Sequence, residues 1–171
     1  MIATVTEPVS LKAALSDVQA EVDRRFDVLL AVPDDARAGL YRAMRHAAIG
    51  GGKRLRPLLV RATADLFAVD RDCSALAGTA VEAIHIYSLI HDDLPAMDDD
   101  DLRHGKPTVH KAFGEATAIL AGDCLHALAF EVLADPATHP DAPARVELVQ
   151  ELAQASGPTG MAGGQALDLA A

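Results

Sequence analysis

The segment from Asp72 to His91 constrains the fold most, because it is apolar nearly all the way round. A surface helix carries polar residues on its outer side, so this pattern predicts a helix buried among other elements. Glu82, His85, Ser88 and Asp92 are the exceptions, at spacings of three, three and four residues that put them on one stripe. A single such residue is usually a hydrogen-bonded core residue, but four in register predict a stripe facing a wet or liganded cavity.

Helical periodicity extends over most of the remaining chain. Half of the residues are apolar, Ala and Leu dominate, and the β-branched runs typical of strands are few. Further helices are expected over residues 11–32, 34–49, from 56 onward, 108–134 with a break near Gly114, 145–155 and 161–171. The sequence therefore predicts an all-α fold, organised as one domain over residues 1–171.

Prolines, glycines and capping carboxylates mark the ends of these helices. Pro33 is expected to end the first, and Asp34 and Asp35 are expected to cap the second. Gly50 to Gly52 form a permissive turn before the third helix. The three prolines between residues 136 and 143 indicate a loop.

The acidic balance excludes several classes of partner. With 25 acidic and 15 basic residues, the formal charge is −10, which would repel nucleic acid and anionic membrane surfaces. Residues 1–10 lack the segments of a signal sequence, and no stretch approaches about 18 uninterrupted apolar residues. Cys73 and Cys124 lack metal or disulfide spacing and are expected to be buried free thiols. We expect a cytoplasmic protein without nucleic-acid binding or membrane insertion.

An acidic segment after the buried helix predicts a divalent metal site. Asp92 and Asp93 are followed by four consecutive aspartates at residues 98–101. Crowded carboxylates repel one another unless a cation neutralises them, and hard oxygen ligands suit Mg²⁺ completed by a diphosphate. A solvated acidic loop is the plain alternative. A calcium loop fails, because Arg103 stands where its glycine is required.

A helix break is needed to bring the two acidic groups together. On an unbroken helix, Asp92 and Asp98 would point about 120° apart. Pro95 supplies the break, so the second group can swing back toward Asp92. Asp99 is a geometric rival to Asp98 as the second ligand.

Basic residues flank both the glycine turn and the aspartates. They are Lys53, Arg54, Arg56, Arg103, His104 and Lys106. A glycine turn that leads into a helix start beside cationic side chains is a general way to hold phosphate. Nucleotide sites do not fit, because Lys53 precedes an arginine instead of Ser or Thr, and no GxGxxG follows a strand.

Four of these motifs together resemble the bacterial farnesyl and geranylgeranyl diphosphate synthases. They are GGKRLRP at 51–57, HIYSLIHDDLPAMDDDDLRHGKPT at 85–108, AGDCLHALAFEVLA at 121–134 and GGQALDLA at 163–170. The resemblance implies an isoprenoid synthase-type helical bundle around a central cavity. It also implies isoprenoid biosynthesis, in which isopentenyl diphosphate is condensed with dimethylallyl or geranyl diphosphate to give farnesyl or geranylgeranyl diphosphate.

The resemblance assigns roles to residues that match the family motifs. Lys53, Arg56 and His85 would hold the diphosphate of isopentenyl diphosphate. Asp92 and Asp98 would bind Mg²⁺ on the allylic diphosphate, whose departure leaves a carbocation for the isopentenyl double bond to attack.

Three further positions acquire meaning from the resemblance. Arg103 would contact the allylic diphosphate as a catalytic residue beside the aspartates. His104 would help to bind isopentenyl diphosphate, although it stands where the family has a second arginine. Tyr87 lies five residues before Asp92, where the family places a bulky residue that limits chain growth, which favours a fifteen-carbon product.

The resemblance also implies a homodimer and a C-terminal half that this sequence does not include. Family members are commonly homodimers and run to nearly twice this length, with a second aspartate-rich motif and a lysine beyond Ala171. The expectation is a bundle that lacks its C-terminal half. Two alternatives are a truncated, non-catalytic isoprenoid diphosphate-binding protein and a terpene cyclase, and GGKRLRP argues against the cyclase.

Overall fold

The computed structural model describes residues 10–171 and confirms the all-helical prediction. The helices are α1 (Leu11–Leu29), α2 (Ala38–Ala48), α3 (Leu55–Leu66), α4 (Arg71–Asp92), α5 (Val109–Phe113), α6 (Glu115–Ala134), α7 (Ala142–Ser156) and α8 (Met161–Leu169). Two short strands, β1 (Leu102–Arg103) and β2 (Lys106–Pro107), join α4 to α5.

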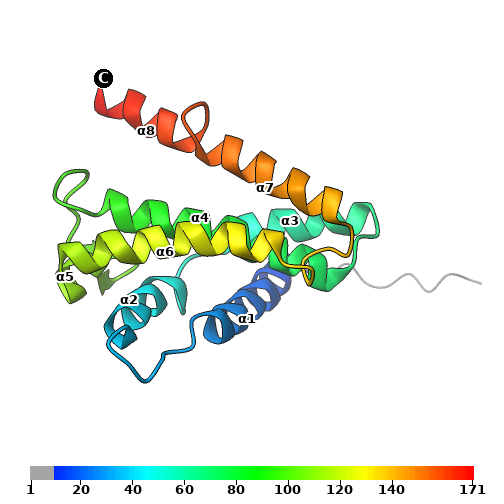
Figure 1. Cartoon of the computed structure of the whole chain (residues 1–171), viewed down its shortest axis with the longest axis horizontal. Helices are drawn as coiled ribbons and strands as arrows, with labels where there is room; N and C mark the ends of the chain where they lie inside the picture. Colours follow the sequence, from blue (N-terminus) through cyan, green and yellow to red (C-terminus); the bar gives the residue numbers. More distant parts are fainter. Residues whose placement is uncertain (1–9) are drawn as a thin grey trace, which may run out of the picture.

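Helices α4 and α6 form the centre of the bundle. Figure 1 shows them side by side, with α1 and α2 on one side and α7 and α8 on the other. Ala80 and Ala83 of α4 are almost completely buried, as are Leu125 and Ala129 of α6. The prediction that the apolar segment is a buried helix is confirmed.

Small residues allow α3 and α4 to approach closely. A Cβ atom at Gly78 of α4 would lie 3.2 Å from the Cα atom of Pro57 in α3. Only a glycine fits this crossing without movement of the α3 backbone. The close packing holds the start of α3, which follows the glycine turn, against the middle of α4.

Three helix boundaries differ from the sequence predictions by three residues or more. Helix α1 ends at Leu29, three residues before the predicted end at Val32. Helix α2 begins at Ala38 instead of directly after Asp34 and Asp35. The Asp35 carboxylate accepts hydrogen bonds from the backbone N–H of Arg37, at 2.8 Å, and from its guanidinium, so it ties a turn and caps no helix. Helix α7 begins three residues earlier than expected, with Pro143 in its first turn, where a missing N–H costs nothing.

The polar segment after the aspartates contains a hairpin that the sequence analysis missed. Strands β1 and β2 pair antiparallel, with Leu102 opposite Pro107 and Arg103 opposite Lys106. His104 and Gly105 form the turn with φ of 53° and 77°, the left-handed pair that matches the twist of a two-residue hairpin. The hairpin turns Arg103 and His104 toward α4.

Within residues 10–171, α4 and α6 are long and apolar enough to cross a membrane by length and composition alone. Neither is an uninterrupted apolar run, because each carries Asp, Glu or His residues. The core helix of a helical bundle meets the same criterion, and α4 and α6 pack against each other.

Both cysteines are free thiols, as the sequence predicts, but they are half-buried instead of buried. Partial burial is the main cause that raises the pKa of Cys73 and of Cys124, and a nearby aspartate adds to it in each case. Thiols with raised pKa values are weak nucleophiles at neutral pH, so neither is a candidate catalytic group.

Candidate functional site

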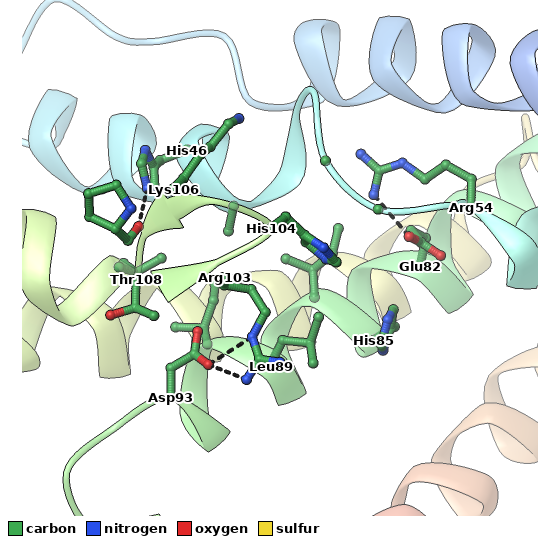
Figure 2. Close-up of a pocket in the computed structure, with 17 residues that line it drawn as sticks. His46, Arg54, Glu82, His85, Leu89, Asp93, Arg103, His104, Lys106 and Thr108 are labelled. Carbon is green, nitrogen blue, oxygen red and sulfur yellow. Dashed lines mark hydrogen bonds and ion pairs between the residues drawn. The ribbon is translucent and has the colours of Figure 1, made fainter. Parts of the chain in front are cut away.

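A small cavity of about 60 Å³ lies between α2, the glycine turn, α4 and the hairpin. Figure 2 shows the polar residues that surround it: His46, Arg54, Glu82, His85, Asp93, Arg103, His104, Lys106 and Thr108. Apolar side chains of α4 form the rest of the wall, namely Ile86, Leu89 and Ile90. Three segments that are distant in the sequence therefore meet at one polar pocket.

The polar stripe of α4 faces this pocket only in part. Glu82 and His85 line it, as predicted. Ser88 does not line it, because its buried hydroxyl donates to the carbonyl of His85 at 2.8 Å within the helix. Asp93, which the sequence analysis left out of the site, lines the pocket in place of Asp92.

Arg54 is buried at the end of the glycine turn and is committed to protein partners. Its side chain donates to Glu82 at 2.9 Å, to Asp23 of α1 at 2.8 Å and to the carbonyl of Ala48 at 2.6 Å. The residue is only 3% exposed. Sequence reasoning grouped Arg54 with the phosphate ligands. The signal that could have shown its structural role was Glu82 in the predicted buried helix, because a buried carboxylate requires a cationic partner.

Lys53 and Arg56 flank Arg54 and are exposed, outside the lining of the pocket. Burial lowers the pKa of the half-buried His85, and the positive charge of Arg56 is the next largest cause. Helices α3 and α4 pack against each other, so the start of α3 lies alongside α4.

Arg103 reaches from β1 to the end of α4. Its Nε atom donates to Asp93 Oδ1 at 2.9 Å, and its Nη2 atom donates to the same oxygen at 2.5 Å and to Asp100 Oδ2 at 2.9 Å. Asp93 is 3% exposed, and its burial raises the pKa of that carboxyl against the opposing effect of Arg103. The pair fixes the hairpin to α4, a role for Asp93 that the motif alone did not reveal.

The chain folds back after α4 as the break at Pro95 predicts. Helix α4 ends at Asp92, and the backbone N–H of Asp98 donates to the carbonyl of Asp92 at 2.8 Å. Burial raises the pKa of the Asp92 carboxyl, and the negative charge of Asp98 raises it further. Asp92 also accepts a hydrogen bond from the side chain of Gln165 in α8.

These two carboxylates fit a magnesium ion of the kind that a substrate completes. Within residues 10–171, no group of three or more His, Cys, Asp or Glu side chains is arranged to hold a metal. Mg²⁺ commonly takes only one or two protein carboxylates and fills its remaining positions with water and phosphate oxygens. The repulsion that raises the pKa of Asp92 is the physical reason that a cation would be favourable between it and Asp98.

The hairpin is fastened to the glycine turn on its other side. His46 Nε2 lies 2.7 Å from the carbonyl oxygen of Pro107, and Lys106 Nζ donates to the carbonyl of Ile49 at 3.3 Å. The imidazole of His104 lies against Gly51, 3.8 Å from where a Cβ atom would be. The hairpin therefore packs directly against the end of α2 and the glycine turn.

Comparison with known proteins agrees with this arrangement. The polyprenyl synthetase family profile matches residues 37–171. Farnesyl diphosphate synthase of Escherichia coli K12 is 58% identical over 132 residues, which are 76% of this chain and 44% of that protein. Farnesyl diphosphate synthase of Bacillus subtilis is 45% identical over 165 residues, which are 94% of this chain and 54% of that protein.

Solved structures show the same fold. The crystal structure of an FPP/GFPP synthase from Zymomonas mobilis superposes with a TM-score of 0.92 at 60% sequence identity, covering 94% of this chain and 58% of that one. A geranyltransferase from Legionella pneumophila superposes with a TM-score of 0.85 at 44% identity, covering 92% and 55%. The chain spans about half the length of the curated relatives it matches. The profile match covers well over half of the chain, which therefore belongs to the polyprenyl synthetase family.

Proposed function

We propose that this chain carries substrate sites of a prenyltransferase that condenses isopentenyl diphosphate with dimethylallyl or geranyl diphosphate, giving farnesyl or geranylgeranyl diphosphate. One observation carries the proposal: a single helix, α4, has His85 in a pocket lined also by Arg54, Arg103 and His104, and ends at Asp92, whose carbonyl accepts the backbone N–H of Asp98. Two anionic groups could thus be held along one helix. The names of the similar proteins support this reaction.

Isopentenyl diphosphate is assigned to the basic surface at the glycine turn. Lys53, Arg56 and His85 would hold its diphosphate, with His104 beside them on the hairpin. The positive charge of Arg56 disfavours the protonated form of His85, and the negative charge of a bound diphosphate would attract that form and outweigh the repulsion. Binding should therefore favour protonation of His85.

The allylic diphosphate is assigned to the acidic end of α4. Asp92 and Asp98 would hold Mg²⁺, which when bound neutralises charge on the departing diphosphate. Arg103 has its Nε and Nη2 atoms engaged by Asp93 and Asp100, so the donor offered to the substrate is Nη1. A fixed guanidinium at this position stabilises negative charge without reorganisation.

The apolar wall protects the cationic intermediate. Ile86, Leu89 and Ile90 border the pocket, and side chains of this kind exclude water that would quench an allylic cation. Tyr87 packs edge-on against His91 and His126, with ring centres 5.6 and 4.9 Å away. A bulky, supported ring near the acidic end favours the shorter, fifteen-carbon product.

The proposal includes a cellular setting and an assembly. Residues 1–171 would form one all-helical domain that acts in the cytoplasm without membrane insertion. A homodimer is supported by the outer side of α6, where Ile119 and Leu120 are about half exposed. Such an apolar face favours contact with a second copy.

Calorimetry and a turnover assay with the 171-residue chain test the function. We expect binding of isopentenyl diphosphate without metal, Mg²⁺-dependent binding of geranyl diphosphate, and extraction of labelled prenyl product. Asp92→Asn combined with Asp98→Asn should abolish the metal-dependent binding and leave isopentenyl diphosphate binding intact. Asp65→Asn, an exposed aspartate of α3, serves as the control. Failure of the unaltered chain to bind either diphosphate in the presence of Mg²⁺ would contradict the proposal.

A further inference from the structure

We propose that Arg54 is a positioning residue, and that Asp23 and Glu82 act with it to hold the glycine turn and thereby set where Lys53 and Arg56 lie relative to His85. The inference rests on the proposed function only for the identity of the ligand, isopentenyl diphosphate. Arg54 itself would touch no substrate. Its effect would pass through the residues on either side of it.

The first observation is the state of the Arg54 guanidinium. Its side chain and that of Glu82 are 2% and 3% exposed, and Nη1 lies 2.9 Å from the Glu82 oxygen. Nη2 is shared between Asp23 and the carbonyl of Ala48. Both terminal nitrogens donate to protein groups, and Nε is buried without a hydrogen-bond partner among the described residues. The guanidinium is thus turned toward the protein, and its role is to connect three helices and a turn. Figure 2 shows the Arg54 to Glu82 contact beneath the turn.

The second observation is that Asp23 joins both ends of the turn. Its Oδ1 atom accepts from Arg54 at 2.8 Å, and its Oδ2 atom accepts from the backbone N–H of Gly50 at 3.3 Å. The Asp23 carboxylate of α1 therefore holds the first and last residues of the segment from Gly50 to Arg54 close together. Lys53 lies within the closed segment and Arg56 lies just after it.

The third observation is the backbone of the turn itself. Gly50, Gly52 and Arg54 all have left-handed φ values, of 72°, 74° and 52°. A non-glycine residue in this region costs of order 1 kcal/mol and persists only where the surroundings impose it. The contacts of Arg54 with Asp23 and Glu82 are the surroundings that impose it here.

The register between the turn and α4 follows from Glu82. It precedes His85 by three residues, or nearly one helical turn. The ion pair between Arg54 and Glu82 thus fixes the height of the turn along the axis of α4. His85 lies about one helical turn further along the same face of that helix. Displacement of a binding group by about 1 Å can cost two orders of magnitude, so such a fixed register matters to a bound diphosphate.

A paired substitution tests this role while preserving the fold. Removing Arg54 alone would leave Glu82 as a buried, unpaired charge and would destabilise the whole protein. Arg54→Met together with Glu82→Met removes both charges at constant net charge, an exchange that buried pairs often tolerate. The matched control is Arg61→Met with Asp17→Asn, which removes the ion pairs of Asp17 in α1 with Arg61 of α3, at 2.6 Å, and with Arg71 of α4, at 2.8 Å, away from the turn.

Two measurements are made on each protein. Hydrogen exchange of the segment 49–55 should become at least about tenfold faster in the Arg54/Glu82 variant and stay unchanged in the control. The Kd for isopentenyl diphosphate should rise by about tenfold or more, while the Kd for Mg²⁺-loaded geranyl diphosphate should change less than about twofold. A general loss of stability would weaken both ligands together.

The outcomes separate the two proposals. Unchanged exchange in the segment 49–55 overturns the positioning role, whatever the protein binds. Faster exchange with an unchanged Kd for isopentenyl diphosphate also overturns it, because the order of the turn would then have no influence on binding of the ligand. If the unaltered chain binds no isopentenyl diphosphate, the proposed function fails, and the exchange result still decides whether Arg54 holds the turn.

Discussion

At the scale of single residues, the protonation of His85 is controlled by its surroundings. Burial lowers its pKa below 6.5, and the charge of Arg56 lowers it further. Between the lowered pKa and 6.5, the unfolded chain therefore binds more protons at this residue than the folded chain does. The contribution of His85 to stability rises with pH through that window and is lost as pH falls through the lowered pKa.

Arg56→Met should raise the pKa of His85 toward 6.5, because it removes the largest charge effect and leaves burial in place. The measurement is an NMR titration of the His85 imidazole in the two proteins. Arg61→Met is the control, since Arg61 pairs with Asp17 on another face. An unchanged His85 titration in the Arg56 variant would show that the two side chains do not sense each other.

His104→Arg should lower the KM for isopentenyl diphosphate several-fold. A neutral histidine binds phosphate less well than a permanently charged guanidinium, and the imidazole already lies against Gly51 in the glycine turn. Steady-state kinetics with the allylic diphosphate saturating give the answer. An unchanged or raised KM would count against a role for this position in binding isopentenyl diphosphate.

Residue identity alone did not disclose what Arg54 and Asp93 do. Both belong to motifs whose other charged members are exposed or partly exposed, yet Arg54 and Asp93 are buried ion-pair partners. Arg54 and Asp23 are 31 residues apart in sequence. A contact of this range depends on how α1 packs on the turn, which periodicity does not specify.

At the scale of secondary-structure elements, α4 and α6 depend on one close contact. A Cβ atom at Gly122 of α6 would lie 2.2 Å from the Nε2 atom of His91 in α4. The same nitrogen lies 3.1 Å from the carbonyl oxygen of Ile119, so the imidazole has little freedom to move away. The glycine therefore makes room for a histidine between the two central helices.

Gly122→Ala should lower the free energy of unfolding by about 1–2 kcal/mol, because the cost of overpacking exceeds the gain in helix propensity. The same substitution in a His91→Ala background should be stabilising by about 0.5–1 kcal/mol, since only the propensity gain remains. Urea denaturation of the four proteins forms a double-mutant cycle. Equal effects in both backgrounds would exclude His91 as the cause.

Elements were predictable where one local signal decided them. The helical period gave α4 and α6 with nearly correct ends, and Gly114, with φ of 86°, divides α5 from α6 as expected. Asp35 misled the prediction of α2 because a carboxylate can tie a turn as readily as it caps a helix. The hairpin was missed because its strands are two residues long, too short for any alternating pattern.

At the scale of the whole molecule, the outer face of α6 predicts the oligomeric state. Leu120 is 53% exposed on the outer side of α6, next to the half-exposed Ile119. Leu120→Glu should convert a dimer to a monomer, because a charge at the centre of an apolar interface is costly to desolvate. The control is Leu66→Glu. Leu66 is 82% exposed at the end of α3, and this substitution should leave the dimer intact.

Sedimentation velocity at micromolar protein concentration distinguishes these species. If the unaltered chain is monomeric, it forms no dimer interface. If the dimer survives Leu120→Glu, its interface lies elsewhere on the molecule. The sequence alone could not locate such a face. It showed α6 to be apolar, but which side stays uncovered depends on how α2, α4 and α7 pack around it.

The distance between the two proposed anion sites follows from the continuity of α4. His85 and Asp92 are seven residues apart on one unbroken helix, a rise of about 10.5 Å. The relative placement of the two reacting molecules would then be set by backbone geometry and not by loop closure. One residue inserted between them would rotate the acidic end by about 100° and turn the donor and the acceptor toward different sides of the bundle.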